Sequence, residues 1–278
     1  MSSVHVPEQV APMMPRTLFN SDHEAFRKTA RRFFEQEIAP YHEKWEEQQH
    51  LDRDLLNKAG ALGLLCPTMP EEYGGSGVDR LYSVIMMEEQ ARVGDSASGF
   101  SLHSDIVANY INNFGNEAQK QQWLPKMASG EVVSAIAMTE PGTGSDLQAV
   151  QTRAIDMGDH YVLNGSKIFI TNGYLCDMAV VVAKTGNSEK GAQNISLLIV
   201  DAHSEGFSKG KPLKKVGMKG QDTCELFFNN VKVPKENLLG MEGMGFIMLM
   251  KELAWERMMI GIMCVARSEE RRVGKECR

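Results

Sequence analysis

The sequence predicts an α+β protein with an all-helical N-terminal domain, a central antiparallel β-barrel or sandwich domain, and the first helix of an incomplete C-terminal helical domain. Three observations support this prediction. Apolar residues recur at helical spacing to about residue 131, short β-type runs fill residues 132–240, and a helical pattern resumes at Gly245. Because turns rather than helices separate the β-type runs, a doubly wound parallel sheet is not expected.

The helical domain is expected over residues 19–131, after a loose, proline-containing arm at residues 1–18. Ser21 and Glu24 have the spacing of a capping box, and the apolar positions of the helix that they open continue until Pro40. These signals predict one amphipathic helix that ends at the proline. Further helical patterns follow at residues 51–62, 84–93, 100–114 and 117–127.

The central domain is expected over residues 132–240, where short β-type runs alternate with turns. Tyr161–Leu163, an Asn164-Gly165 pair and Ile168–Ile170 have the pattern of a β-hairpin with a two-residue turn. Three more β-type runs lie at residues 180–182, 195–200 and 226–228.

Residues 241–268 are expected to begin the third domain. The helix that starts at Gly245 includes the strongly apolar run Met258–Ala266, which predicts neighbours on several of its sides. The apolar period stops there, and residues 269–278 form an atypical charged tail. The pattern suggests a truncation junction, and a solvated C-terminal tail is the alternative.

Composition narrows the class of protein. The 278 residues carry 30 Lys and Arg against 36 Asp and Glu, a formal charge of −6 that is unsuited to a phosphate backbone, so nucleic acid is not an expected partner. The longest nearly uncharged apolar run, Met258–Ala266, is too short for a bilayer, and residues 1–15 lack the order of a secretory signal. We therefore expect a soluble intracellular protein without a membrane span.

Cysteine, methionine and histidine give weaker signals. The five cysteines lie far apart without a CxxC pair, which favours reduced thiols over a disulfide framework or a metal site. The 18 methionines are interpreted as core filling, with a cleft for a flexible apolar ligand as the alternative. Among the histidines only His103, in an apolar helical stretch, is a candidate for a site, and a structural role is favoured.

The most informative segment runs from Ile136 to Asp146. The segment begins as a β-type run and continues with Thr, Pro, two glycines, Ser and Asp. These residues would place unpaired backbone N–H groups and hydroxyls in a concave turn. Such a turn suits an anionic or carbonyl-rich ligand, and a tight loop with an Asp cap is an equal alternative. Gly142 and Gly144 are not followed by a third glycine, so a Rossmann site is not supported.

AMTEPGTGSD at residues 137–146, followed by NGSKIFITNG at 164–173, resembles the flavin-binding signature of the acyl-CoA dehydrogenase family. The resemblance extends from Phe19 to Ser268. It implies an FAD cofactor, an acyl-CoA substrate, an electron-transferring flavoprotein as acceptor, a homo-oligomer when the protein is full length, and a cytoplasmic or mitochondrial matrix location. Three further segments are similar to the long-chain type, namely FSLHSDIVANYI at 100–111, GMKGQDTCELFF at 217–228 and MKELAWER at 250–257.

The resemblance also implies roles for residues of the motif. Met138 and Thr139 match positions at the flavin's pyrimidine edge, Thr171 matches a hydroxyl near flavin N5, and Ser145 matches a residue between the cofactor and the thioester. A strand threonine paired across the sheet is the alternative for Thr171. The full set implied to bind the cofactor is Ile136, Met138, Thr139, Gly144, Ser145, Phe169, Ile170 and Thr171.

Substrate oxidation in this family removes an α-proton and sends a β-hydride to the flavin, so a base is required. Glu256 stands where the long-chain and isovaleryl types carry that base, and its apolar neighbours would raise its pKa. The alternative is a surface glutamate paired with a cation, as expected for Glu252. The residues implied to bind substrate are Ser145, Ala192, Gln193, Trp255 and Arg257.

Two other functions remain open from the sequence. Flavin oxidases and monooxygenases share the scaffold, although Glu256 argues against the monooxygenases. The chain is alternatively an inactive truncated fragment that binds flavin or acyl-CoA, because the third helical domain of the family is missing from the sequence.

Overall fold

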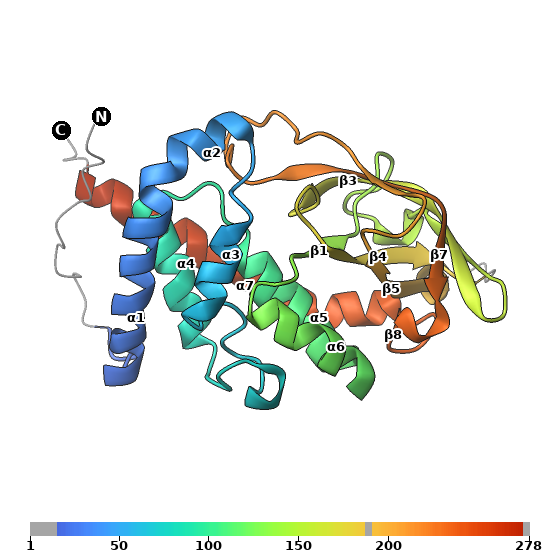
Figure 1. The fold of residues 1–278 in the computed structure, drawn as a ribbon, viewed down its shortest axis with the longest axis horizontal. Coiled ribbons are helices and arrows are strands. Elements are labelled where there is room, and N and C mark those ends of the chain that lie inside the picture. Colours follow the sequence, from blue (N-terminus) through green and yellow to red (C-terminus); the bar gives the residue numbers. More distant parts are fainter. Residues whose placement is uncertain (1–15, 187–190, 275–278) are drawn as a thin grey trace.

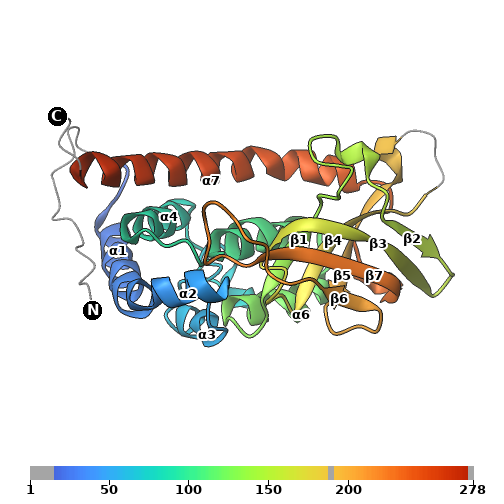
Figure 2. The ribbon, with the colours of Figure 1, turned by 90° about the horizontal axis from the view of Figure 1, so that it is seen from above.

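The computed structural model of the protein describes residues 16–186 and 191–274. Helices occupy one half of the molecule and strands the other, and the long helix α7 (Gly245–Gly274) runs past both (Figures 1 and 2). This order of helical domain, sheet domain and final helix confirms the predicted α+β architecture.

The N-terminal half consists of helices joined by short turns. They are α1 (Ser21–Phe33), the π-helical turn η1 (Phe34–Ile38), the 3₁₀ turn η2 (Ala39–Tyr41), α2 (His42–Gln48), α3 (Asp54–Ala61), the 3₁₀ turn η3 (Glu71–Tyr73), α4 (Leu81–Val93), the π-helical segment η4 (Leu102–Val107), α5 (Ala108–Phe114) and α6 (Glu117–Ala128).

The predicted capping box of α1 is wrong by one residue. The side chain of Asn20 accepts hydrogen bonds from the backbone N–H groups of Asp22 and His23, each at 3.0 Å, and the N–H of Asn20 donates to His23 Nδ1 at 3.1 Å. Asn caps a helix as well as Ser does, and the imidazole performs the role expected of Glu24. Pro40 does not end the helical path, because it sits in the first turn of η2, where a missing N–H costs nothing.

Within residues 16–186 and 191–274, eight strands form one sheet in the order β6-β7-β3-β2-β4-β5-β8, with β1 paired to β4. Most neighbours are antiparallel, whereas β1–β4 and the single β2–β4 pair are parallel. The strands are β1 (Ser134–Ala137), β2 (Arg153–Asp156), β3 (His160–Thr171), β4 (Met178–Lys184), β5 (Ile195–Asp201), β6 (Phe207–Lys209), β7 (Thr223–Pro234) and β8 (Leu238–Leu239); the 3₁₀ turns of this half are η5 (Leu147–Ala149), η6 (Gly191–Asn194) and η7 (Lys235–Asn237).

The predicted hairpin turn at Asn164-Gly165 is wrong, because β3 continues through it as one strand. The register against β7 shifts between Leu163 and Gly165, so the pair forms a bulge. Gly165 has φ +148°, and a Cβ there would lie 2.4 Å from Thr152 Oγ1 on the neighbouring chain segment. The true hairpin joins β2 to β3.

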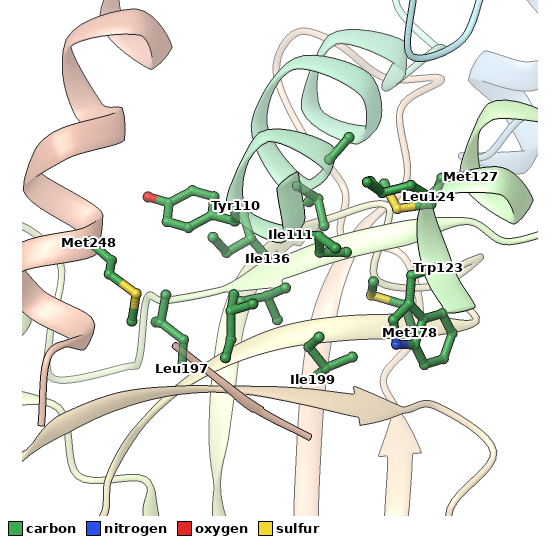
Figure 3. Close-up of a cluster of buried hydrophobic side chains, with 14 of the residues drawn as sticks. Tyr110, Ile111, Trp123, Leu124, Met127, Ile136, Met178, Leu197, Ile199 and Met248 are labelled. Atoms are coloured by element: carbon green, nitrogen blue, oxygen red, sulfur yellow. The ribbon is translucent and has the colours of Figure 1, made fainter. Parts of the chain in front are cut away.

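The sheet is buried on both faces, and β4 shows the two-residue period clearly. Met178, Val180 and Val182 belong to a core cluster shared with α5 and α6, whereas the intervening Ala179 and Val181 belong to a second cluster on the other face. Figure 3 shows the first cluster, in which side chains of α5, α6, α7 and the sheet meet.

Helix α7 packs along one side against α4, α5, η4 and β5. Met248, Leu249 and Met259 are buried there, whereas Met258 and Ile260 are 59% and 63% exposed. The sequence predicts neighbours on several sides of this helix, but the described residues pack against one side only. The backbone stays helical into the charged segment, as far as Gly274. Residues 275–278, like residues 1–15 of the expected arm, lie outside the described residues.

Candidate active site

The loop that follows β1 carries the AMTEPGTGSD motif and lies against β3. Backbone bonds between Glu140 and Thr143, of 2.9 and 3.0 Å, close a tight turn. The N–H of Ile168 on β3 donates to the carbonyl of Thr139 at 2.9 Å. The side chain of Asp146 accepts from the N–H of Gln148, so the expected Asp cap is present as well. The two halves of the motif are thus joined directly.

A buried ion pair that the sequence analysis missed holds this junction. Lys167 Nζ donates to Glu140 Oε1 and to the carbonyl of Met138, each at 2.9 Å, and Glu140 also accepts from the N–H groups of Gln151 and Thr152. Burial lowers the pKa of Lys167 to about 8 against the opposing charge of Glu140. Burial opposes ionisation of Glu140, but Lys167 and these donors hold its pKa below the usual value. The signals available in the sequence were Glu140, one of two acids in the first half of the motif, and Lys167, the one cation in the second half.

Three hydroxyl groups of this region are free to bind a ligand. Those of Thr139, Ser145 and Thr171 make no hydrogen bond to protein within the described residues; Thr139 and Thr171 are half-buried and Ser145 is exposed. Phe169 lies at a bulge of β3 with φ +60° and leaves 62% of its surface exposed. A flat ligand with a polar edge fits a free aromatic side chain beside unpaired hydroxyls.

The other residues implied to bind the cofactor contribute differently. The side chains of Ile136 and Ile170 are only 8% and 3% exposed and pack in the two core clusters. Met138 is half-buried against the first of these clusters. A Cβ at Gly144 would meet nothing within 4 Å, so this part of the loop is open. Thr171 lies directly opposite Thr223 of β7, as its structural alternative expected, while its hydroxyl remains unpaired.

Glu256 lies near the middle of α7 and its carboxylate is turned toward the molecule. The hydroxyl of Tyr110 on α5 donates to Glu256 Oε1 at 2.9 Å. Burial is the largest influence on the pKa of Glu256 and raises it, the charge of Glu252 raises it further, and the hydrogen bond from Tyr110 opposes both. Figure 3 shows Tyr110 between Ile136 of β1 and Met248 of α7, so the side chain that holds the carboxylate also contacts the core beneath the motif.

Glu252 is not the exposed, cation-paired glutamate that the sequence predicts. It is only 8% exposed, and Oε1 accepts a hydrogen bond of 2.8 Å from Asn113 Nδ2 on α5. The prediction failed because the face of α7 that carries Glu252 packs against α5, whose polar side chains meet it.

The residues expected to bind substrate are not all brought together. Ala192 and Gln193 lie in η6, which contacts both η5 of the motif loop and the start of α7. Trp255 lies farther along α7, with the guanidinium of Arg80 at 4.5 Å from its ring. Arg257 is exposed and makes no hydrogen bond or ion pair within the described part of the chain. Arg257 lies roughly 18 Å farther along the axis of α7 than Gly245, the first residue of this helix.

His103 has a structural role. It is fully buried, its Nε2 donates to the carbonyl of Met127 at 3.0 Å, and its Nδ1 accepts from the N–H of Ser134 at 3.3 Å. Burial lowers its pKa to about 4, so the ring stays neutral and links η4 to α6 and β1.

No group of three or more His, Cys, Asp or Glu side chains in the described ranges is arranged to hold a metal ion. Within the same ranges, none of the helices combines the length and the apolar character that crossing a membrane requires.

Comparison with protein families matches two models to the chain. The N-terminal domain of acyl-CoA dehydrogenases matches residues 20–131, and their middle domain matches residues 135–231. The long-chain specific acyl-CoA dehydrogenase of Rattus norvegicus mitochondria is 48% identical over 91% of this chain, and the isovaleryl-CoA dehydrogenase of Solanum tuberosum mitochondria is 39% identical over 92%. The chain spans 59% and 63% of the lengths of these two relatives.

Solved structures give the same result for the fold. An acyl-CoA dehydrogenase from Geobacillus kaustophilus superposes with a TM-score of 0.90 at 45% identity, covering 92% of this chain and 68% of that one. An acyl-CoA dehydrogenase complexed with FAD from Bacillus anthracis gives a TM-score of 0.85 at 38% identity, covering 91% and 43%. Agreement in both sequence and fold over most of its length shows that this chain belongs to the acyl-CoA dehydrogenase family.

Proposed function

We propose that the protein containing this chain is an FAD-dependent acyl-CoA dehydrogenase that introduces a Cα–Cβ double bond into a long or branched acyl-CoA thioester. Family membership and the similarity to long-chain relatives support the reaction class. The observation that carries the proposal for this chain is Glu256, a half-buried carboxylate with a raised pKa at the position expected for the base.

FAD, when bound, supplies the acceptor for the substrate's β-hydride. The residues that fit it are those of the open motif loop and of β3. Thr139 and the backbone of Met138 would donate to its polar edge, Thr171 would donate near its reactive nitrogen, and Phe169 would cover an apolar face. Donors placed where negative charge develops stabilise that charge without reorganisation.

The chain's own residues provide the remaining chemistry. Glu256 takes the α-proton. Its partial burial holds the negatively charged carboxylate away from bulk water, which raises its pKa and makes it a better proton acceptor. Ser145 lies on the exposed part of the loop, where it would separate cofactor from thioester. Ala192, Gln193, Trp255 and Arg257 are proposed to contact the coenzyme A part, in which Arg257 would bind phosphate or stack on adenine.

Anaerobic titration of the FAD-loaded protein with a long-chain acyl-CoA tests the proposal. We expect the yellow flavin to bleach and the α,β-unsaturated thioester to form in equal amount. Rapid re-oxidation in air would identify an oxidase instead, and a protein that takes up no FAD would be the inactive fragment. Thr139→Ala should weaken FAD binding, whereas Ser208→Ala, which removes an exposed hydroxyl of β6, should not.

We further propose that electrons pass to an electron-transferring flavoprotein and that the protein assembles as a homo-oligomer. The family resemblance supports both. Stopped-flow mixing of the bleached protein with electron-transferring flavoprotein should restore its colour faster than air does, and sedimentation velocity should give a mass several times that of one chain. Slow recovery with that acceptor, or sedimentation as a single chain, would contradict the respective statement.

A further inference from the structure

Helices α5 and α7 carry two matched pairs of polar side chains at their interface. Tyr110 and Asn113, one turn apart on α5, donate hydrogen bonds to Glu256 and Glu252, one turn apart on α7. The bonds measure 2.9 and 2.8 Å. Residues spaced by three or four positions share one helix face, so the two bonds act on neighbouring points of the same interface.

The hydroxyl of Tyr110 is held in one direction. Its side chain is completely buried in the first core cluster, and a carboxylate can only accept the proton. Burial and the two nearby glutamates raise the pKa of Tyr110 far above its ordinary value, so the phenol remains a donor at any working pH. Oε1 of Glu256 is therefore permanently engaged, while the described residues supply no donor to Oε2.

We propose that Tyr110 is a positioning residue that fixes Oε1 of Glu256 and leaves Oε2 as the oxygen that accepts the substrate's α-proton, with Glu252 held by Asn113 as the neighbouring charge that keeps this carboxylate basic. The inference rests on the proposed function, because it assumes that Glu256 is the base. It adds which oxygen reacts and which side chains orient and tune it.

Two neighbouring side chains shift the pKa of Glu256 in opposite directions. The hydrogen bond from Tyr110 stabilises the charged form, whereas the negative charge of Glu252 destabilises it. On the side of α4, Arg80 stacks on Trp255, and the buried Asp105 of η4 is influenced by Arg80 and Ser83. Tyr110 and Glu252 are therefore the two groups whose removal should shift the pKa of Glu256, and in opposite directions.

Carboxyl ¹³C NMR of this chain without flavin tests the balance directly, with the Glu256 signal assigned by its loss in Glu256→Gln. Tyr110→Phe should raise the pKa of Glu256 by about one unit, and Glu252→Gln should lower it by a similar amount. Tyr161→Phe is the matched control, because that buried tyrosine donates to Glu242 at 3.0 Å in the β domain. An unchanged or lowered pKa in folded Tyr110→Phe would overturn the proposal.

A second measurement applies if Tyr110→Phe does not fold. Glu252→Gln, which keeps the hydrogen bond from Tyr110, should still lower the pKa of Glu256 in the same NMR measurement, and no shift in that folded variant would overturn the proposal. In the FAD-loaded protein, Tyr110→Phe should move the ascending limb of the kcat profile to higher pH and lower kcat several-fold with little change in KM. If Glu256→Gln still bleaches normally, the proposed function is wrong even where the NMR shifts appear, so the two failures are distinguishable.

Discussion

The ammonium group of Lys167 lies 2.9 Å from Glu140 Oε1, and the two side chains are 0% and 4% exposed. The pair joins the loop after β1 to strand β3, which together carry the proposed flavin site. Because Lys167 also donates to the carbonyl of Met138, the same contact fixes the backbone next to Thr139. A buried charge that loses its partner keeps its desolvation cost, so this contact is a sensitive point of the β domain.

Lys167→Met should lower the free energy of unfolding by about 3–5 kcal/mol, because it leaves Glu140 buried without a counter-charge. The double variant Lys167→Met/Glu140→Gln should recover part of that loss, because it removes the uncompensated charge. The single amide oxygen can still accept from only one of the two N–H groups, those of Gln151 and Thr152, that donate to the two carboxylate oxygens of Glu140. Lys58→Met is the control, because Lys58 is half exposed in its pair with Glu37 and its loss should change stability far less. Urea unfolding measures all three, and equal losses in the two single variants would contradict the prediction.

The architecture could be predicted from the sequence because each element shows its period. Strand β4 alternates between two core clusters, and most of the helices before residue 131 lie where the helical spacing predicts them, although α2 was not predicted. Asn164-Gly165 misled the prediction because it is a strong local turn signal, yet β7 is long enough to pair with β3 on both sides of it. The extended pairing outweighed the local preference.

Candidate site residues could be proposed from the sequence where a motif existed, whereas contacts with a partner far along the chain could not be predicted. Tyr110 is one apolar-face residue among several in its helix, and its acceptor Glu256 is 146 residues away. Likewise, a lysine in a strand ordinarily faces water, and only the approach of the loop places Lys167 inside the protein. Contacts of this kind depend on tertiary structure that no local pattern encodes.

Gly165→Ala should destabilise the protein by about 2 kcal/mol, because its Cβ would meet Thr152 Oγ1 at 2.4 Å and φ is +148°. Gly142→Ala, where a Cβ meets nothing within 4 Å and φ is not positive, should change stability little. Thermal unfolding of the two variants compares them. Equal midpoints would contradict the close approach of Gly165 to Thr152 and its positive φ.

Asp105 should make stability depend on pH. Burial raises its pKa to about 7, against the opposing influence of Ser83 and Arg80, whereas the unfolded chain has the ordinary value of 3.8. The folded state therefore gains most from this group below pH 3.8 and loses that gain as pH rises to 7. Asp105→Asn lacks this pH dependence. The difference between its free energy of unfolding and that of the parent should therefore shift in favour of the variant, by roughly 4 kcal/mol at most, as pH rises from 4 to 7.

Unfolding titrations at several pH values check the Asp105 prediction. Ser83→Ala removes the donor that favours the charged carboxylate, so the loss of stability should then extend to higher pH. Parallel curves for the parent and Asp105→Asn would mean that the carboxyl ionises alike in the folded and unfolded chains.

Arg80→Ala should weaken the packing of α7 on α4 by about 1 kcal/mol, because the guanidinium lies 4.5 Å from the ring centre of Trp255. Lys120→Ala is the comparison, since its ammonium is 5.9 Å from the Tyr73 ring and should matter less. Urea unfolding near pH 5 isolates the stacking contact, because Asp105 still holds its proton there. A larger effect of Lys120→Ala would contradict this ranking.

Glu256→Gln should leave FAD binding intact and abolish bleaching by acyl-CoA in a full-length protein that carries this sequence. The amide keeps the size of the side chain and can still accept the hydrogen bond from Tyr110, but it cannot take the α-proton. Glu242→Gln is the matched control, because Glu242 also accepts from a buried tyrosine and is exposed between β8 and α7. Flavin absorbance reports cofactor content before substrate is added and reduction afterwards. The two variants differ only in which tyrosine-bonded carboxylate is neutralised. Bleaching that survives in Glu256→Gln would therefore place the base on another residue. Loss of bleaching in both variants would point to a general effect of removing a negative charge.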